Sequence, residues 1–280
     1  MLSLRQQRIF ITHKGKTMKS ILITGAAGGM GRATASLFQK LGWRVFALDR
    51  VAIEKDENIF PIVADLTHEE SVRAAMEDVE HETDRLDAII HFAGVYMLDS
   101  LVEMSTEAYD RIFEINVRGV YLVNKHFLPL LDKGSRILIT TSELAPLDPL
   151  PFTGIYAITK AALDRYAYSL CMELQLLGIS VSVLRAGAVE TNMLGASTTA
   201  LDRFCKETKL YSCNAKRFKG IVERVESRCV PPAKIAAKCA RILKKRHPRY
   251  AYSINRNPLL LMLNVLPRRL QLWIIKQVLR

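Results

Sequence analysis

Short apolar runs alternate with amphipathic segments of helix length from residue 20 onward, and this alternation constrains the fold more than any other feature of the chain. An apolar run with no polar alternation is typical of a strand buried on both faces. Strands that alternate with helices predict right-handed βαβ crossovers and a doubly wound α/β fold, with one parallel sheet between two helical layers. The strand-like runs are residues 20–24, 44–48, 60–64, 87–91, 135–140 and 179–185.

The segments between these runs carry start and stop signals of helices. Residues 29–41 show a helical pattern that Gly42 closes at the C-cap. Thr67 with Glu70 three residues later has the pattern of a capping box. Two helical stretches are expected before Leu131, and a long helix is expected over residues 154–177. Residues 249–253 supply a seventh strand, which gives the expected strand order 3-2-1-4-5-6-7.

Residues 192–230 interrupt the alternation, because they are polar, contain cysteines and look irregular. A segment of this length inside a compact domain is usually a lid or a binding loop. We therefore expect a substrate lid here, within a single domain that spans residues 19–253. The 280 residues, of which 49% are hydrophobic, suit one large domain with a substantial core.

Cysteine and histidine usage gives no sign of a metal site or a disulfide framework. The five cysteines are odd in number and none forms a Cys-x-x-Cys pair, and no two of the six histidines are spaced i, i+4. This usage is typical of a reducing compartment, so we expect a cytoplasmic protein without a bound metal.

The net charge of +12 is concentrated at the two ends of the chain. Residues 1–19 contain five basic residues and no acidic one, residues 20–191 contain 15 basic and 24 acidic residues, and residues 230–280 contain 12 basic residues and none that is acidic. No recognition helix or zinc-finger pattern accompanies this charge, so nucleic-acid binding is not expected. Residues 1–18 form a basic N-terminal extension. Its longest apolar run, Ile9-Phe10-Ile11, is too short for the apolar region of a signal peptide.

The C-terminal tail, residues 254–280, is both apolar and basic. Pro267, followed by two arginines, divides it into halves that are too short to span a membrane. From Leu270 onward, apolar residues cover most of a helix, so water cannot be its only neighbour. The tail can fold over a substrate cleft, pack against a second subunit of a homo-oligomer, or make peripheral contact with a membrane. The excess of basic residues favours an anionic lipid surface.

A glycine-rich turn follows the first strand directly and leads into a helix. The segment Thr24-Gly25-Ala26-Ala27-Gly28-Gly29-Met30-Gly31 allows a tight turn, a close backbone approach to a pyrophosphate, and unpaired helix N–H groups that face the phosphates. Asp49 ends the second strand, at about the distance expected of a carboxylate that accepts from ribose hydroxyls. Together these features predict a Rossmann fold that binds a dinucleotide.

The pattern Thr24-Gly-x-x-x-Gly-x-Gly31, combined with Tyr156-Ala-Ile-Thr-Lys160, resembles the short-chain dehydrogenase/reductase family. The resemblance covers roughly residues 19–191 and matches the branch of about 250 residues. It implies an NAD(P)-dependent oxidoreductase that interconverts a secondary alcohol and a ketone. The tail also weakly resembles the branch of hydroxysteroid and retinol dehydrogenases, which implies a hydrophobic substrate such as a steroid- or retinoid-like molecule.

The resemblance assigns four catalytic residues, namely Asn116, Ser142, Tyr156 and Lys160. Tyr156 and Lys160 are spaced i, i+4 and so project from one helix face. A tyrosine ordinarily titrates near pH ~10, and the Lys160 ammonium, with a positive nicotinamide, is expected to lower that pKa. Ser142 would bind the substrate oxygen, and Asn116 would hold a water that links Lys160 to solvent. The implied cofactor contacts are Gly25, Gly29, Met30, Gly31, Asp49, Asp65, Ala93, Gly94, Tyr156, Lys160, Val189 and Thr191.

Two positions depart from the family pattern. His91 stands where the family commonly has asparagine, and we interpret it as a core histidine. Ala186 stands where proline is common, which removes a fixed φ beside the nicotinamide pocket. Asp49 favours NAD over NADP, because a carboxylate repels a 2′-phosphate, although Arg50 argues the other way. The alternative function is a catalytically silent dinucleotide-binding sensor or interaction protein, for which the catalytic residues would be unnecessary.

Overall fold

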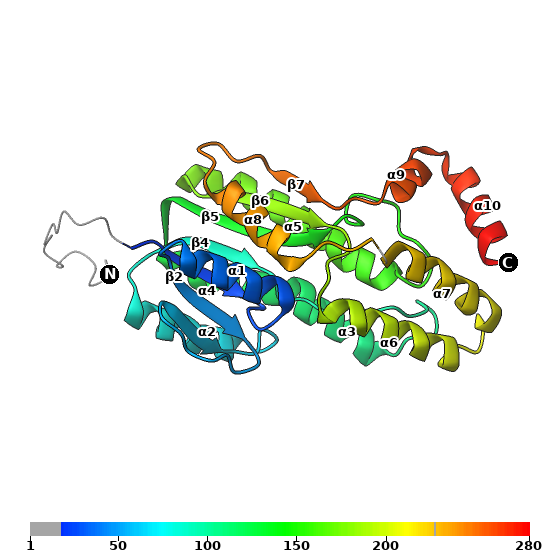
Figure 1. Cartoon of the computed structure of the whole chain (residues 1–280), viewed down its shortest axis with the longest axis horizontal. Helices are drawn as coiled ribbons and strands as arrows, with labels where there is room; N and C mark the ends of the chain where they lie inside the picture. Colours follow the sequence, from blue (N-terminus) through cyan, green and yellow to red (C-terminus); the bar gives the residue numbers. More distant parts are fainter. Residues whose placement is uncertain (1–17, 227) are drawn as a thin grey trace, which may run out of the picture.

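Seven parallel strands form one sheet in the order β3-β2-β1-β4-β5-β6-β7 (Figure 1). The computed structural model describes residues 18–226 and 228–280, so residues 1–17 of the predicted basic extension lie outside the described residues. The strand order and the parallel pairing confirm the predicted doubly wound fold in a single domain. The strands are β1 (Ser20–Thr24), β2 (Arg44–Asp49), β3 (Ile59–Val63), β4 (Leu86–His91), β5 (Leu131–Ser142), β6 (Ser180–Ala186) and β7 (Ala251–Ile254).

Strand β1 shows why the predicted strands are apolar throughout. Ile21 and Ile23 pack against α1 (Gly29–Lys40) and α8 (Pro232–Leu243), which lie side by side on one face of the sheet (Figure 1). Leu22 points to the other face, into a second core. Because both faces of the sheet are covered, successive side chains on either side of the strand must be apolar. The helices that contribute to the second core are α2 (Glu69–Glu82), α4 (Gly119–Phe127) and α5 (Gly154–Leu174).

Helix α2 begins at Glu69, so the predicted capping box at Thr67 is wrong. The helix N-cap is His68, whose side chain makes no capping hydrogen bond. The Thr67 hydroxyl instead donates to Asp65 Oδ1 over 2.8 Å, and the Thr67 backbone N–H donates to the same oxygen over 2.9 Å. The Thr67 side chain therefore takes part in a local turn around the Asp65 carboxylate and does not cap the helix.

The two helical stretches predicted before Leu131 are joined by an irregular turn. Helix α3 (Thr106–Phe113) runs into a π-helical turn, Glu114–Arg118, before α4 begins. Such turns are rare and frequently occur at functional sites, and this one contains Asn116. Short 3-10 turns follow α4 and α5, at Leu128–Leu130 and Gln175–Leu177.

Residues 192–230 are mostly helical, so the prediction of an irregular segment is wrong. They form α6 (Asn192–Glu207) and α7 (Ser212–Glu226). Phe204 and Phe218 are buried in a third core, where their ring centroids lie 4.7 and 5.4 Å from that of Phe152. Apolar residues spaced three or four apart, such as Leu201 with Phe204, indicate these helices in the sequence itself.

The C-terminal tail forms two helices that extend the molecule beyond the end of the sheet (Figure 1). Helices α9 (Pro258–Val265) and α10 (Arg268–Leu279) are separated at Pro267, as the sequence predicts. Leu279 is buried against the third core, and Asn214 Nδ2 on α7 donates to its carbonyl oxygen over 2.6 Å. Within the described part of the chain, no helix has both the length and the apolar character that membrane crossing requires.

His91 is the core histidine that the sequence suggests. It is 1% exposed, and its Nε2 lies 3.0 Å from Asn124 Oδ1. Its Nδ1 has no hydrogen-bond partner among the described residues. Burial lowers the pKa of His91 to about 4, from an ordinary value of 6.5, despite an opposing hydrogen bond to Asn124.

We predict that His91 makes the fold sensitive to acid. Between pH about 6.5 and about 4 the unfolded chain binds a proton that the folded protein excludes, so the free energy of unfolding falls as the pH drops through this window. His91→Asn removes the titration, and the stability difference between the two proteins should then change by up to ~1.4 kcal/mol per pH unit. Urea unfolding across this range measures it. A parallel loss of stability in both proteins would contradict the assignment.

Candidate active site

A cavity of about 250 Å³ lies at the carboxyl ends of β4, β5 and β6. Ligands of doubly wound folds bind at this edge of the sheet. Seven of the predicted site residues line the cavity, namely Met30, Gly94, Ser142, Tyr156, Lys160, Val189 and Thr191. Its remaining lining residues are Phe92, Tyr96, Thr140, Thr141, Glu143, Leu144, Leu150, Thr153, Ala186, Gly187, Ala188, Phe218, Ile221, Val222 and Leu260.

Tyr156 and Lys160 lie one turn apart near the start of α5 and reach the cavity together with Ser142. The Lys160 Nζ lies 5.7 Å from the centroid of the Tyr156 ring. Ser142 ends β5, and its Oγ accepts a hydrogen bond from the backbone N–H of Leu144 over 3.2 Å. The structure therefore brings these three predicted catalytic side chains together in one pocket.

Burial dominates the ionisation of this pair in the protein alone. Burial raises the pKa of Tyr156, and the neighbouring Tyr96 raises it further, while a hydrogen bond with Ser142 has the opposite effect. Burial also lowers the pKa of Lys160 to about 8. Loss of water disfavours the charged form of both groups, so the protein by itself stabilises neutral tyrosine rather than phenolate. The predicted lowering of the Tyr156 pKa depends on the Lys160 ammonium together with a positive nicotinamide, and it stays a prediction.

Asn116 is fully buried in the π-helical turn, and its side chain is already bonded to protein. Its Oδ1 accepts from the backbone N–H of Val95 over 2.7 Å, and its Nδ2 donates to Val95 O and to Thr159 Oγ1 over 3.0 and 3.1 Å. A Cβ built on Gly94 would lie 3.2 Å from Asn116 Oδ1 and 3.3 Å from Lys160 Nζ. The Asn116 amide thus holds the chain segment that passes beside Lys160, and the water that it was expected to hold stays a prediction.

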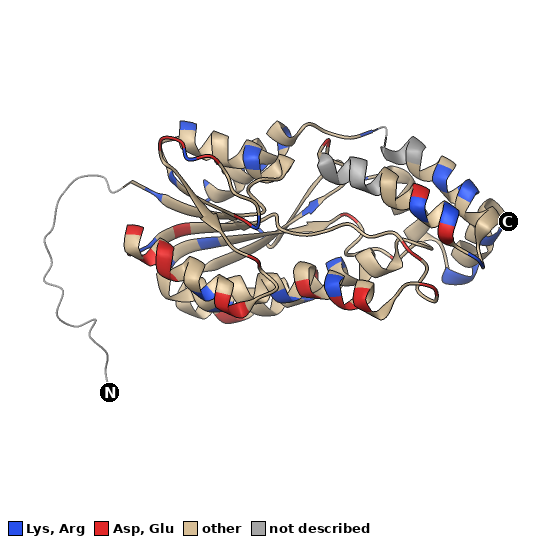
Figure 2. Ribbon diagram, turned by 90° about the horizontal axis from the view of Figure 1, so that it is seen from below, with Lys and Arg blue, Asp and Glu red and all other residues tan. Residues whose placement is uncertain are grey.

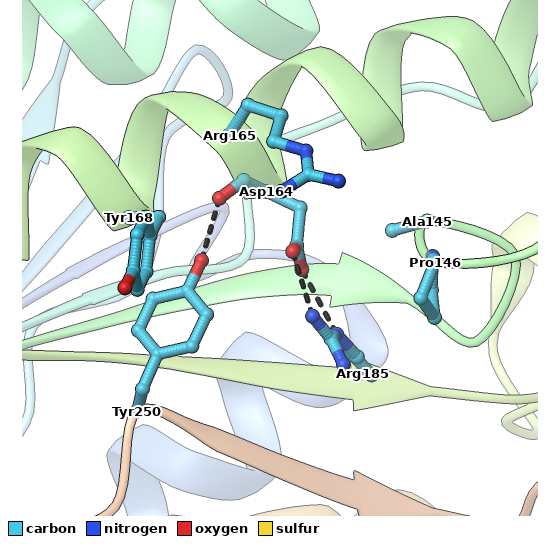
Figure 3. A pocket seen from close by; sticks show the side chains of 7 residues that line it. All are labelled: Ala145, Pro146, Asp164, Arg165, Tyr168, Arg185 and Tyr250. Atoms are coloured by element: carbon cyan, nitrogen blue, oxygen red, sulfur yellow. Dashed lines mark hydrogen bonds and ion pairs between the residues drawn. The ribbon is translucent and has the colours of Figure 1, made fainter.

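An ion pair inside the fold fixes helix α5 against the catalytic strand. Arg185 on β6 donates from Nε and Nη2 to the two carboxylate oxygens of Asp164 over 3.0 and 2.7 Å (Figure 3). Thr141 on β5 donates to Asp164 Oδ1 over 3.4 Å, and the Tyr250 hydroxyl donates to its carbonyl oxygen over 2.5 Å. Asp164 lies one turn beyond Lys160, so these bonds set the position of the helix face that carries Tyr156 and Lys160.

The glycine-rich turn makes contacts that only glycine permits. Gly25 has a φ of +69°, and a Cβ there would lie 2.6 Å from Ala93 N. A Cβ on Gly31 would lie 2.1 Å from Gly25 O. A Cβ on Gly29 would meet Thr191 Cγ2 at 2.8 Å, so the start of α1 lies against the loop that follows β6.

The N-terminus of α1 is open to an anion. Its N-cap is Gly28, which has no side chain, and its first turn contains no acidic residue. The unpaired N–H groups of a helix start, with the helix dipole, favour a phosphate. These residues fit the pyrophosphate of a dinucleotide, and Gly25, Gly29 and Gly31 provide the close backbone approach that such a group needs.

The two acidic residues assigned to the adenosine half stand at the carboxyl ends of the paired strands β2 and β3. Asp49 Oδ2 accepts from the backbone N–H of Ala27 over 3.0 Å, which places its carboxylate at the glycine-rich turn. Asp65, after β3, is exposed, and its hydrogen bonds from Thr67 lower the pKa of its carboxyl group. Both positions fit the adenosine half of the same cofactor.

The loop after β6 brings the remaining predicted contacts to the cavity. Val189 pairs with Val230 in an isolated parallel bridge, which ties this loop to the segment before α8. The Thr191 hydroxyl donates to Val189 O over 3.4 Å. Ala186, where proline was expected, is held in register by its pairing with Ser142 and Ile254.

Several cavity residues were not singled out in the sequence. Tyr96 packs on Tyr156 with ring centroids 4.9 Å apart, and its position two residues after Gly94 is the signal that points to it. Glu143 follows Ser142 directly and enters the cavity wall as a buried carboxylate. Phe218 of α7 and Leu260 of α9 reach the cavity only because the tertiary fold brings these helices back over it.

Comparison with known proteins agrees with this geometry. The family model described as short chain dehydrogenase matches residues 19–202. A 3-ketodihydrosphingosine reductase from Bacteroides thetaiotaomicron is 27% identical over 81% of this chain and 84% of its own. Oxidoreductase UcpA from Escherichia coli is 35% identical over 63% of this chain and 72% of its own. Mouse estradiol 17-beta-dehydrogenase 2 is 32% identical over 68% of this chain, which spans 55% of that enzyme.

Solved structures share the fold. A short-chain dehydrogenase from Streptomyces avermitilis superposes with a TM-score of 0.74 over 94% of this chain and 98% of its own, at 22% identity. A 3-ketoacyl-(acyl-carrier-protein) reductase from Brucella melitensis, complexed with NADH, has a TM-score of 0.68 over 84% of this chain and 96% of its own, at 25% identity. The matched motifs, sheet order and cavity together establish that the chain belongs to the short-chain dehydrogenase/reductase family of NAD(P)-dependent oxidoreductases.

Proposed function

We propose that the protein interconverts a hydrophobic ketone and its secondary alcohol, with Tyr156 as the proton donor and acceptor. The observation that carries this proposal is the convergence of Ser142, Tyr156 and Lys160 on one cavity that borders the dinucleotide turn. A nicotinamide cofactor, when bound, supplies the hydride for reduction and accepts it in oxidation.

The side chains divide the proton chemistry of this reaction. In reduction the carbonyl carbon gains a hydride and its oxygen gains the Tyr156 proton, so the ketone becomes an alcohol. The Ser142 hydroxyl donates to the substrate oxygen as negative charge develops there. Lys160 and the positive charge of an oxidised cofactor favour the phenolate that remains, which offsets the burial that raises the pKa of Tyr156. Asn116 keeps the Val95 segment in place beside Lys160.

NAD is the cofactor that we propose. Asp49 presents its carboxylate at the glycine-rich turn, where it can accept from both ribose hydroxyls and would repel a 2′-phosphate. Gly28 offers no basic side chain there. Arg32 is close by, but its Nη2 is bonded to Ala27 O over 3.1 Å. Gly25, Gly31, Asp65, Ala93, Val189 and Thr191 complete the proposed cofactor contacts.

The substrate that we propose is largely apolar. The cavity wall away from Tyr156 is formed by Leu150, Phe218, Ile221, Val222 and Leu260. A relative named estradiol 17-beta-dehydrogenase 2 and another named 3-ketodihydrosphingosine reductase support a hydrophobic ketone or alcohol. Helices α7 and α9, which supply four of these side chains, form the lid over the cavity together with α6, which packs against α7.

We further propose that the tail makes peripheral contact with an anionic membrane from the cytoplasmic side. Leu260 faces the cavity, while Leu259, Met262, Leu272 and Trp273 are each more than half exposed. The ribbon at the end of the molecule that carries the C-terminus includes many Lys and Arg positions, with a few Asp or Glu positions among them (Figure 2), and no acidic residue follows Cys229. An apolar face beside basic residues is the arrangement that anionic lipid binds.

Homo-oligomer formation is a separate proposal, and it involves a different surface. Tyr121 on α4 and Tyr168, Met172 and Leu176 at or just beyond α5 are exposed to between 45% and 83%, which leaves apolar side chains available to a second copy. Exposed apolar residues that gather on neighbouring helices commonly mark protein–protein contacts.

Replacing Tyr156 by phenylalanine is expected to reduce turnover by ~10²–10⁴-fold, the usual contribution of general acid–base catalysis. The ring still fills the cavity, so NADH affinity should stay within a few-fold. Absorbance of the nicotinamide with a panel of hydrophobic ketones measures turnover, and fluorescence titration measures binding. Retention of more than about a tenth of wild-type turnover would exclude Tyr156 as the proton donor.

The ratio of kcat/KM for NADH to that for NADPH tests the role of Asp49. We expect the wild-type protein to prefer NADH, and Asp49→Ser to lower that preference by about tenfold, because one lost charge repulsion or ribose hydrogen bond is worth ~1–3 kcal/mol. Asp65→Asn is the control, since this residue lies on the adenine side. A wild-type preference for NADPH would overturn the assignment.

Gly29→Ala tests the contact between α1 and the loop that carries Thr191. Its new methyl group would meet Thr191 Cγ2 at 2.8 Å, so the loop must move and dinucleotide affinity should fall by at least about tenfold. Thr191→Ser removes that methyl but keeps the hydroxyl, and the double variant should recover part of the affinity. If the double variant binds no better than Gly29→Ala, the two segments do not act together on the cofactor.

Sedimentation with vesicles tests the membrane proposal. Full-length protein should bind anionic vesicles at low salt more strongly than neutral ones, because the attraction is screened by salt. Replacing Leu272 and Trp273 by serine should remove binding without changing the net charge. Tyr109→Ser, which alters an aromatic residue of similar exposure on α3, should have no effect. Equal sedimentation with both kinds of vesicle would rule out anionic lipid as the partner.

A further inference from the structure

Glu143 is a buried carboxylate that the proposed proton chemistry does not use. It directly follows Ser142, is 8% exposed, and lines the substrate cavity. The other side chains of this lining that carry an ionisable group are Tyr96, Tyr156 and Lys160, and among the described lining residues Lys160 is the one cation. A carboxylate is rarely placed in an otherwise apolar wall without a partner, because removing its charge from water is costly.

One Glu143 oxygen is bonded to the protein, and the other accepts no hydrogen bond from the described residues. Oε2 accepts from the backbone N–H of Asn257, at the start of α9, over 2.6 Å. Oε1 lies 3.0 Å from where a Cβ on Gly187 would stand, and Gly187, which has none, is itself part of the cavity lining. A Cβ there would first meet Asn255 O at 1.9 Å, so the Asn255 backbone fills that direction. What leaves Oε1 available to a ligand is that no described residue donates a hydrogen bond to it, although Glu143 lines the cavity.

The charge of Glu143 has no close partner among the side chains that the structure describes. Burial raises the pKa of this carboxyl group, opposed by the Asn257 hydrogen bond and by the more distant, exposed Arg256. The Asp164 carboxylate on α5, by contrast, accepts two hydrogen bonds from the Arg185 guanidinium on β6. The Glu143 carboxylate can therefore still bind a cation or accept a further hydrogen bond.

The two charged groups of the cavity stand on different sides of the catalytic strand. Lys160 is next to Gly94, after β4, whereas Glu143 is next to Gly187, after β6, and β5 with Ser142 lies between them. A substrate whose carbonyl meets Ser142 and Tyr156 can therefore place a second polar group toward Glu143, away from the lysine. Its apolar part would then lie along Phe218, Ile221 and Leu260.

We propose that Glu143 determines specificity by binding a protonated amine that an otherwise apolar substrate carries near its reacting carbonyl. The substrate class is a long-chain amino ketone or the corresponding amino alcohol. This inference rests on the proposed function and adds the polar group that the cavity selects. The amine supplies the positive charge that offsets the buried carboxylate, and neither group takes part in hydride or proton transfer.

The test compares two ketones of equal length with the full chain and NADH. One is dodecanone, and the other is its derivative with an amine on the carbon next to the carbonyl. Wild-type protein should favour the amino ketone in kcat/KM, and Glu143→Gln should lower the ratio of the two values at least about tenfold, which corresponds to ~1.4 kcal/mol. Glutamine keeps the size of the side chain and can still accept from the Asn257 N–H.

Asp148→Asn is the matched control for a purely structural role. Asp148 also fixes the tail, because its Oδ2 accepts from Gln271 Nε2 over 3.3 Å and its backbone N–H donates to Asn264 Oδ1 over 2.6 Å, yet it does not line the cavity. This variant should leave the ratio of the two kcat/KM values unchanged. Equal shifts of the ratio in both variants would mean that Glu143 only anchors the tail.

Binding of dodecylamine and dodecanol to the NADH complex separates the inference from the proposed function. Wild-type protein should bind the amine more tightly, and Glu143→Gln should remove the difference. Turnover of dodecanone without any preference for the amine in either assay would overturn the role of Glu143 and leave the proposed function intact. Amine binding that depends on Glu143, without turnover of either ketone, would support the site and overturn the proposed function.

Discussion

Exclusion of water at the carboxyl edge of the sheet governs the chemistry of this protein. The sheet is covered on both faces, and helices α6, α7 and α9 continue the cover beyond its end. Side chains that enter this edge lose their hydration, so burial raises the pKa of Tyr156 and of Glu143 and lowers that of Lys160. Each of these groups is therefore poised to respond to a charge that a cofactor or substrate brings.

The C-terminal tail shows how one segment serves both the cavity and the surface. Asn257 and Asn264 bond it to the chain around the end of β5, while Leu260 completes the apolar wall. The opposite sides of the same helices expose Met262 and Trp273. The sequence left three surfaces that the tail could contact: the substrate cleft, a second subunit or a membrane. In the structure, Leu260 of the tail lines the cleft. The outward face remains available for lipid or a second copy.

The motif residues were predictable because their positions depend on neighbouring residues in the chain. Gly25, Gly29 and Gly31 follow a strand directly, and Tyr156 and Lys160 share one helix face, so spacing alone brings them to one edge of a parallel sheet. The predicted capping box at Thr67 was wrong because the Thr67 hydroxyl bonds to Asp65 instead of capping the helix. The sequence contains both possible partners and does not show which of the two hydrogen bonds is more stable. The helices of residues 192–230 were missed, although the spacing of Leu201 and Phe204 indicated one of them.

The sequence by itself determined the sheet order and the dinucleotide turn, because these depend on periodicity and on contacts between near neighbours in the chain. The proposed catalytic roles of Tyr156 and Lys160 came from the resemblance of their motif to the family. Only the tertiary structure decided which side chains close the cavity and how they ionise. Tyr96, Glu143, Phe218 and Leu260 come from four separate segments, and their meeting depends on long-range packing. Burial, which no spacing encodes, raises the pKa of Tyr156, and the neighbouring Tyr96 raises it further.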